Sequence, residues 1–261
     1  MLSLAAIEQF RALAAARGPL MVATDLDGTL APIVPNAADA RVPAATLAVL
    51  DRLASGAKVA VITGRDLNTA RRMIPCEEVI VIGSHGLEAT FENDLLPGVD
   101  RLALGGALER VEQKVVSAVP SAFLHVERKA ISTAFHYRQT PDLEHPLRKA
   151  LEELPEGLRI REGRMVLEVL PDARGGKDLA LAALMKQYRS RALLVMGDDA
   201  TDAAMFRTAL KLAPEGVHVL LAGVSGGSET PPEIAELSDV LLRSTDEALE
   251  ALETVARALG V

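Results

Sequence analysis

Short apolar runs recur along the chain, and each one ends in small or polar residues. Uninterrupted apolar runs of this kind are typical of strands that are buried on both faces of a parallel sheet. The pattern predicts strands at residues 20–24, 59–62, 79–82, 192–196 and 217–222.

Segments with helical spacing of their apolar residues lie between or after these runs, at residues 44–54, 67–74, 177–188, 201–210 and 246–259. Strands that alternate with helices predict a parallel sheet with helices on both faces. We therefore expect an α/β fold whose core is a Rossmann-like, doubly wound parallel sheet.

The middle of the chain has a different order of elements. Helical spacing alternates here with pairs of strand-like segments, at residues 102–119, 123–127, 131–137, 143–154, 158–161 and 165–170. This αββαββ order predicts a small α+β unit inserted after the third strand of the sheet. We place the core at residues 1–99 and 172–261, and the inserted unit at residues 100–171.

Two aspartates follow the first predicted strand, in the sequence Asp25-Leu26-Asp27-Gly28-Thr29. Open parallel sheets bind their ligands beyond the carboxyl ends of the strands, where this cluster falls. Two carboxylates here can hold a hard cation, and they can divide the work of phosphoryl transfer. One would attack phosphorus, while the other would move protons to the leaving oxygen and from water. The alternative is a strand-end turn without chemistry.

The strand at 192–196 is followed by a second acidic cluster of Asp198, Asp199 and Asp202. Three carboxylates this close repel one another unless a cation compensates them. We expect a metal ion here, since helix capping by Asp199 or Thr201 would not need three acids.

Hydroxyl and positively charged groups that could bind an anion follow the predicted strands at residues 59–62 and 165–170. Thr63-Gly64-Arg65 offers a hydroxyl group and a helix N-terminus to phosphate oxygens. Lys177 begins a predicted helix, and its positive charge interacts unfavourably with the positive end of the helix dipole. A nearby anion that compensates this charge is therefore plausible. An ordinary turn and a surface lysine are the alternatives, and both interpretations stay open.

Charged side chains also lie on the predicted strands of the inserted unit, among them Glu127, Lys129, Arg138 and Glu168. Side chains repeat with a period of two along a strand, so Glu127 and Lys129 share one face. Such a face can exchange hydrogen bonds with a sugar, or it can simply be solvated.

Composition narrows the possible partners. The net charge of −8 and the absence of tryptophan argue against nucleic acid and anionic membranes as partners. Cys76 is the only cysteine, so no intrachain disulfide can form. Glu8 and Arg11 interrupt the apolar N-terminal pattern, so we expect no signal peptide and a cytoplasmic location. A monomer is the favoured state.

Taken together, the motifs resemble those of the haloacid dehalogenase (HAD) superfamily of phosphatases. The matching positions are residues 25–30 for its first motif, Thr63 for the second, Lys177 for the third and residues 197–202 for the fourth. Within it the chain most resembles the trehalose-6-phosphate phosphatases, through residues 25–33, 83–88, 127–129, 136–138 and 197–206. Ser84, Asp178 and Ala203 depart from residues that this family often has.

The resemblance implies a Mg²⁺-dependent phosphoric monoester hydrolase that acts on a small-molecule sugar phosphate, trehalose 6-phosphate, through an aspartyl-phosphate. It implies that Asp25 is the nucleophile, that Asp27 is the acid and base, and that Thr63 and Lys177 are catalytic groups on the phosphoryl oxygens. The metal site would comprise Asp25, Asp27, Asp198, Asp199 and Asp202.

The inserted unit would then be a cap domain for substrate recognition. The implied substrate-binding residues are Arg65, His85, Gly86, Glu127, Lys129, Arg138 and Glu168. Three alternatives remain at this stage. They are a HAD phosphatase of another sugar phosphate, such as sucrose phosphate or mannosyl-3-phosphoglycerate, a phosphate-receiving signalling domain, and a non-catalytic sugar-phosphate sensor.

Overall fold

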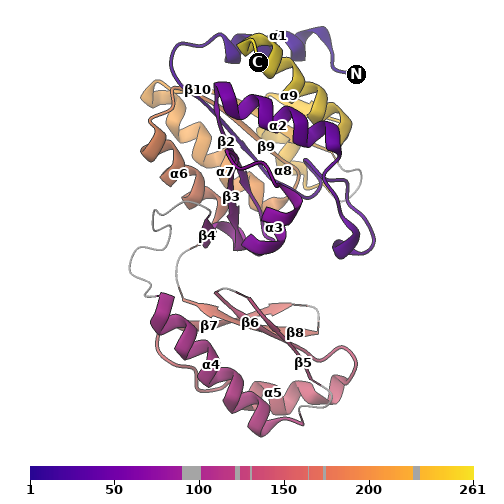
Figure 1. Cartoon of the computed structure of the whole chain (residues 1–261), viewed down its shortest axis with the longest axis vertical. Coiled ribbons are helices and arrows are strands. Elements are labelled where there is room, and N and C mark those ends of the chain that lie inside the picture. Colours follow the sequence, from indigo (N-terminus) through magenta and orange to yellow (C-terminus); the bar gives the residue numbers. More distant parts are fainter. Residues whose placement is uncertain (90–100, 121–123, 130, 164, 173–174, 226–229) are drawn as a thin grey trace. The chain divides into compact units, whose positions relative to one another are not determined.

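The computed structural model describes residues 1–89, 101–120, 124–129, 131–163, 165–172, 175–225 and 230–261. The chain forms two compact units (Figure 1), one of Met1–Leu95 with Gly175–Val261 and the other of Leu96–Arg174. The domain boundary that the sequence predicts at residue 100 lies outside the described residues, and the one at residue 171 coincides with the end of a strand. Each unit is described separately.

The core unit is built on a seven-stranded sheet with the order β11-β10-β9-β1-β2-β3-β4. Its strands are β1 (Leu20–Thr24), β2 (Lys58–Ile62), β3 (Ile80–Gly83), β4 (Glu88–Ala89), β9 (Ala192–Gly197), β10 (His218–Val224) and β11 (Val240–Leu242). All neighbours are parallel except β3 and β4. The predicted α/β fold is confirmed. Strands β4 and β11 were not predicted, because two or three residues carry no readable apolar run.

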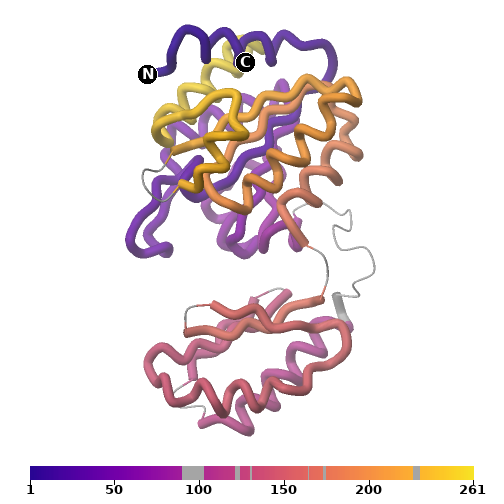
Figure 2. Tube along the Cα trace, turned by 180° about the vertical axis from the view of Figure 1, so that it is seen from behind, coloured from indigo at the N-terminus to yellow at the C-terminus, as the bar shows by residue number. Residues whose placement is uncertain are grey.

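Helices cover both faces of this sheet (Figures 1 and 2). Its helices are α1 (Leu4–Ala14), α2 (Ala44–Gly56), α3 (Leu67–Met73), α6 (Lys177–Tyr188), α7 (Ala200–Leu212), α8 (Pro232–Leu237) and α9 (Thr245–Leu259). Alternate strand residues point to opposite sides. Val22 belongs to the apolar cluster that contains residues of α1, α2, α3 and α9, whereas Met21 and Ala23 belong to the cluster that contains residues of α6, α7 and α8. Both views place the N- and C-termini at the same end of this unit.

Side-chain caps fix where several helices begin. Ser3, Asp66 and Ser244 each accept a hydrogen bond from a backbone N–H in the first turn of α1, α3 and α9. Short 3-10 turns lie at Ala37–Asp39, Ser84–Gly86, Pro141–Leu143 and Ala213–Glu215. In the part of the chain that the structure describes, no helix is both long and apolar enough to cross a membrane.

The inserted unit has the predicted αββαββ order. Its elements are α4 (Arg101–Ala118), β5 (His125–Arg128), β6 (Thr133–His136), α5 (Glu144–Ala150), β7 (Leu158–Gly163) and β8 (Val166–Pro171). The strands form an antiparallel sheet in the order β5-β6-β8-β7. Helices α4 and α5 lie on one side of it (Figure 1), and Phe135 and Leu167 are fully buried. By register, Glu127, Glu168 and Arg161 lie together on the opposite face from these two residues.

Candidate active site

Asp25 and Asp27 lie in a tight loop that leaves the carboxyl end of β1. The Gly28 N–H donates to the Ala31 carbonyl at 2.7 Å, which closes the loop. Gly28 has a φ of +84°, and a Cβ atom there would lie 2.0 Å from Oδ2 of Asp198. Glycine is therefore required, both for the left-handed backbone and for the close approach of Asp198 from the end of β9.

Lys177 connects this loop to the second acidic cluster. Its Nζ donates to Oδ1 of Asp25 at 2.6 Å and to Oδ1 of Asp202 at 2.8 Å. All three residues are buried. The anion that we expected near this helix N-terminus is thus supplied by the protein's own carboxylates. Burial would lower the pKa of Lys177, but the charges of Asp25 and Asp202 outweigh it and hold that pKa above its usual value.

Asp199 and Asp202 form a capping box at the start of α7, so the capping alternative for Asp199 is confirmed. Oδ1 of Asp199 accepts hydrogen bonds from the N–H groups of Thr201 and Asp202, at 2.8 Å and 3.0 Å. Oδ2 of Asp202 accepts from the N–H groups of Asp198 and Asp199. A reciprocal pair of this kind satisfies helix N–H groups that lack partners within the helix. These hydrogen bonds make Asp199 a helix cap, and its metal role stays a prediction.

The remaining acids suit a hard divalent cation. Among the described residues, ligand oxygens of Asp25, Asp198 and Asp202 lie within 4.8 Å of one another. Burial raises the pKa of Asp25 to about 7 despite Lys177. Burial and the charges of Asp202 and Asp199 raise the pKa of Asp198 to about 7. One ammonium group thus under-compensates these carboxylates, and oxygen ligands of this kind match Mg²⁺. Asp25 and Asp198 fit as ligands, with Asp202 beside them.

Thr63 and Arg65 form the loop after β2, next to this cluster. Thr63 is buried, and its Oγ1 accepts a hydrogen bond from the Arg65 N–H at 3.2 Å. The Arg65 guanidinium binds both carboxylate oxygens of Asp27, from Nε at 2.6 Å and from Nη2 at 2.7 Å. Two residues expected to have separate roles, in substrate binding and in proton transfer, are thus paired. The helix N-terminus that follows is capped by Asp66 rather than open to an anion.

The turn after β3 supports the Thr63 loop. Ser84 and His85 both have left-handed backbones, with φ of 51° and 54°. Their N–H groups donate to the carbonyls of Arg65 and Thr63, at 2.7 Å and 2.9 Å. Buried Glu88 accepts from the Ser84 hydroxyl and from the Leu67 N–H. Sequence reasoning gave Glu88 no role, although an acid beside a buried strand was a usable signal.

His85 and Gly86 were predicted to bind substrate, and the structure shows how they pack. A Cβ atom on Gly64 would lie 2.6 Å from the His85 ring, so the ring lies against that glycine. Gly86 has a φ of +95°, and a Cβ there would lie 2.4 Å from the Gly176 carbonyl. This close contact sets the backbone immediately before Lys177. Substrate binding by either residue stays a prediction.

In the inserted unit, the predicted residues Glu127, Lys129 and Glu168 lie together. Nζ of Lys129 is 3.3 Å from Oε1 of Glu168 and 3.9 Å from Oε2 of Glu127. His136 contacts the same Glu127 oxygen at 2.9 Å. Arg138 is exposed beyond the end of β6. The three charged groups therefore offer both donors and acceptors on one side of the sheet.

Arg161 and Ser132 belong to the same cluster and were not predicted. Arg161 binds Oε2 of Glu168 through Nε and Nη2, and the Ser132 hydroxyl donates to Oε1 at 2.6 Å. Burial raises the pKa of Glu168, but these hydrogen bonds and the charge of Lys129 outweigh it and hold that pKa below its usual range. Arg161 lies opposite Glu168 in the register of β7 and β8, a pairing that neither segment of the sequence shows by itself.

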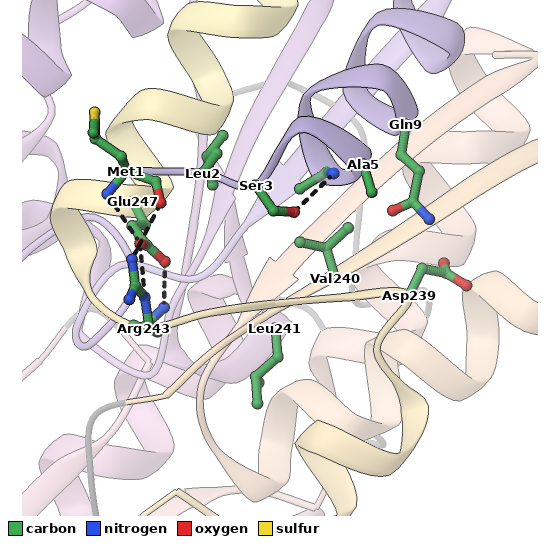
Figure 3. Close-up of a pocket in the computed structure, with 11 residues that line it drawn as sticks. Met1, Leu2, Ser3, Ala5, Gln9, Asp239, Val240, Leu241, Arg243 and Glu247 are labelled. Atoms are coloured by element: carbon green, nitrogen blue, oxygen red, sulfur yellow. Dashed lines mark hydrogen bonds and ion pairs between the residues drawn. The ribbon is translucent and has the colours of Figure 1, made fainter.

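A surface pocket of about 440 Å³ lies elsewhere on the core unit (Figure 3). Its lining comes from the N-terminal segment, from Asp239–Arg243 and from Glu247. Figure 3 shows Glu247 between the chain's amino group and Arg243. None of the predicted catalytic residues lines it.

Comparisons with known proteins agree on one family. The family model described as trehalose-phosphatase matches residues 23–238. The protein named "Probable trehalose-phosphate phosphatase" from Sinorhizobium fredii is 33% identical over 204 residues, which cover 75% of this chain and 76% of that one. The trehalose-phosphate phosphatase of Mycobacterium tuberculosis is 29% identical over 86% of this chain, and the match spans only 61% of its own length.

A solved structure shares the fold. The trehalose-6-phosphate phosphatase of Aspergillus fumigatus superposes with a TM-score of 0.64 and 23% identity, over 98% of both chains. At 23% identity, this structural similarity supports a shared fold and nothing more.

Proposed function

The chain belongs to the trehalose-phosphatase family, and we propose that it hydrolyses trehalose 6-phosphate to trehalose and inorganic phosphate. It is accordingly a phosphoric monoester hydrolase. The observation that carries the chemistry is the cluster at the carboxyl edge of the core sheet, where Lys177 binds Asp25 beside Asp198. The candidate nucleophile Asp25, the ammonium group of Lys177 and a candidate set of metal ligands lie together there.

In the first step of the proposed reaction, an Asp25 oxygen attacks phosphorus and the bond from phosphorus to the sugar oxygen breaks. Asp27 donates a proton to the departing oxygen. In the second step Asp27 accepts a proton from water, the water oxygen attacks phosphorus, and the bond to Asp25 breaks. Inorganic phosphate leaves, and both carboxyl groups return to their starting states.

Asp25 and Asp198 would hold a Mg²⁺ ion, with Asp202 beside them and the Asp27 backbone carbonyl added by the family resemblance. Bound Mg²⁺ supplies Lewis-acid stabilisation of the negative charge on the phosphoryl group. Burial raises the pKa values of Asp25 and Asp198 to about 7, and this supports the assignment because a bound cation would stabilise the ionised carboxylates.

Thr63 and Lys177 are suited to the phosphoryl oxygens. Both are buried at the same edge of the sheet, where a fixed donor is worth more than in water. Lys177 also fixes the orientation of Asp25 through the bond to Oδ1. Because Asp25, Asp198 and Asp202 outnumber this ammonium group, the positive charge that an anionic substrate requires would come from Lys177 together with Mg²⁺.

The inserted unit would act as a cap domain that recognises the sugar. Glu127, Lys129 and Glu168 support this role, because their ionised donors and acceptors can hydrogen-bond sugar hydroxyl groups. The expected cytoplasmic location, the monomeric state and the lack of nucleic-acid partners stay predictions from the sequence.

A substrate panel tests the proposal. Purified protein is assayed with trehalose 6-phosphate, sucrose phosphate, mannosyl-3-phosphoglycerate and p-nitrophenyl phosphate, each with Mg²⁺ and with a chelator. We expect the highest kcat/KM on trehalose 6-phosphate, and only with Mg²⁺. An Asp25→Asn preparation controls for contaminating phosphatases. A higher kcat/KM on another sugar phosphate would reassign the substrate, and no Mg²⁺-dependent phosphate release on any of them would reject the enzymatic role.

A further inference from the structure

Arg65 holds Asp27 in a two-pronged contact. The Nε and Nη2 groups of Arg65 donate to the two different oxygens of the Asp27 carboxylate, at 2.6 Å and 2.7 Å. The Arg65 side chain is only 16% exposed. Bidentate pairs of this kind are among the stronger polar contacts in proteins, and they fix the plane of the carboxylate.

This contact conflicts with the role that the proposed function gives Asp27, on which the present inference rests. A proton donor must turn one oxygen to within about 2.6–3.2 Å of the leaving atom. A carboxylate that offers both oxygens to one guanidinium faces that guanidinium instead. The Arg65–Asp27 contact must therefore open during each turnover.

Arg65 also lies close to the position where a phosphoryl group would bind. Its backbone N–H contacts the hydroxyl of Thr63, which the proposed function places on a phosphoryl oxygen. The hydrogen bonds to Asp27 are the main cause that raises the pKa of Arg65, and the charge of Asp25 contributes as well. Asp27, which the guanidinium binds, lies only two residues after the proposed nucleophile Asp25, so a phosphoryl group attached there would be a second anionic partner.

We propose that Arg65 exchanges partners: it holds Asp27 while the phosphate position is empty, and it binds the phosphoryl oxygens when they arrive. A phosphoryl dianion carries more charge than one carboxylate, so it competes for the guanidinium. Its arrival releases Asp27, which takes up a proton from solvent and then turns toward the leaving oxygen to donate it. Arg65 is thereby a phosphate ligand that, while the phosphate position is empty, holds the acid–base group away from the position of the leaving oxygen.

The exchange is tested by a double-mutant cycle on the affinity for inorganic phosphate, which needs no turnover. The four proteins are wild type, Asp27→Asn, Arg65→Met and the double variant, each titrated with phosphate in Mg²⁺ by calorimetry. Removing the competing carboxylate should free Arg65, so Asp27→Asn should tighten phosphate binding roughly fivefold in the wild-type background. In the Arg65→Met background the same change should matter less than about twofold.

The cycle separates exchange from simple charge repulsion. Loss of the Asp27 charge alone would tighten phosphate binding by the same factor in both backgrounds, and such additivity would overturn the proposal. Arg72→Met, an exposed arginine of α3, is the matched control and should leave the affinity unchanged. Thermal melting checks each protein, and Arg65→Gln replaces Arg65→Met if the latter does not fold.

A second readout separates this proposal from the proposed function. Alkyl phosphates need a proton on the leaving oxygen, whereas p-nitrophenolate leaves without one. Arg65→Gln should raise KM for both substrate types, because it removes a phosphate ligand. Since Asp27 is then no longer held back, kcat for the sugar phosphate should fall no more than kcat for p-nitrophenyl phosphate. A loss of kcat confined to the sugar phosphate would overturn the exchange, because Arg65 would then support the proton transfer directly. If no sugar phosphate is hydrolysed, the proposed function fails, while the phosphate cycle still decides whether Arg65 changes partners.

Discussion

The ammonium group of Lys177 lies 2.6 Å from Oδ1 of Asp25, although 152 positions separate the two residues. The inserted unit lies between them in the sequence, so the catalytic edge exists only when both halves of the core have folded. The same ammonium group also contacts Asp202, and it serves as the shared counter-charge of two buried carboxylates. Catalytic geometry and core stability therefore depend on one side chain.

Replacing Lys177 with methionine should destabilise the fold and abolish activity. The change leaves Asp25 and Asp202 buried without their cation, and breaking a buried ion pair from one side typically costs about 3–5 kcal/mol. Urea unfolding measures the loss. The double variant Lys177→Met/Asp202→Asn should recover part of the stability but none of the activity. Equal stability of Lys177→Met and wild type would contradict the importance of this pairing.

The Asp25→Asn variant should lose turnover by at least about 10³-fold and keep its fold. The amide cannot form the acyl-phosphate bond, yet it fills the same space beside Lys177. Phosphate release from trehalose 6-phosphate and p-nitrophenyl phosphate measures activity, and circular dichroism checks the fold. Retained turnover on both substrates would mean that another group attacks phosphorus.

Stabilisation of the fold by Mg²⁺ should depend on Asp198 but not on its neighbour Asp199. A ligand that binds only the folded state raises the melting temperature, so Mg²⁺ should stabilise the wild type. Asp198→Asn should lose most of this shift because it removes a proposed ligand. Asp199→Ala should lose about 1 kcal/mol of its free energy of unfolding, because it loses a helix cap, but it should keep the rise in melting temperature that Mg²⁺ causes. A lost shift in Asp199→Ala would return that residue to the metal site.

The sequence is informative where a physical pattern is local. An uninterrupted apolar run, as in β1 and β9, predicts a buried strand of a parallel sheet. The acids that follow these runs in the sequence lie at the carboxyl ends of the strands, where such sheets bind their ligands. The three acids after β9 were less decisive. Their spacing permits both a cap and a metal site, and only the observed N–H contacts assign Asp199 to the cap.

Contacts between distant side chains could not be predicted. Arg65 was recognised as a candidate, but its pairing with Asp27 depends on how two loops approach one another and on the choice of side-chain rotamers. Arg161 was missed for a related reason. Its importance comes from lying opposite Glu168 across β7 and β8, and strand register is not written in either segment alone.

The stability of the core unit should show an acid transition that depends on Glu247. Hydrogen bonds from the Arg243 side chain lower the pKa of Glu247 to about 2 (Figure 3). A carboxyl whose folded pKa is depressed adds stability above its unfolded pKa, near 4.5, and loses it as the pH falls toward 2. The urea midpoint should therefore drop more steeply over that range in wild type than in Glu247→Gln. Glu236→Gln, at an exposed position of α8, should follow wild type.

Arg161 should matter for the sugar and not for the phosphate. Its guanidinium fixes Glu168 through two hydrogen bonds, so Arg161→Met leaves that carboxylate held only by Ser132 and Lys129. A hydrogen bond to a charged group is worth about 1.5 kcal/mol, so kcat/KM on trehalose 6-phosphate should fall roughly tenfold, mainly through KM. Activity on p-nitrophenyl phosphate, which has no sugar to orient, should change less than about twofold.

The matched control for this change is Arg159→Met. Arg159 lies two residues earlier on β7, on the same face of the sheet by strand periodicity, and its guanidinium is 3.9 Å from Asp172 rather than bound to Glu168. Both variants remove one positive charge from the same strand. A loss on trehalose 6-phosphate confined to Arg161→Met would therefore come from the orientation of Glu168 and not from the charge of the face. Equal losses in the two variants would reject Glu168 orientation as the source of sugar recognition.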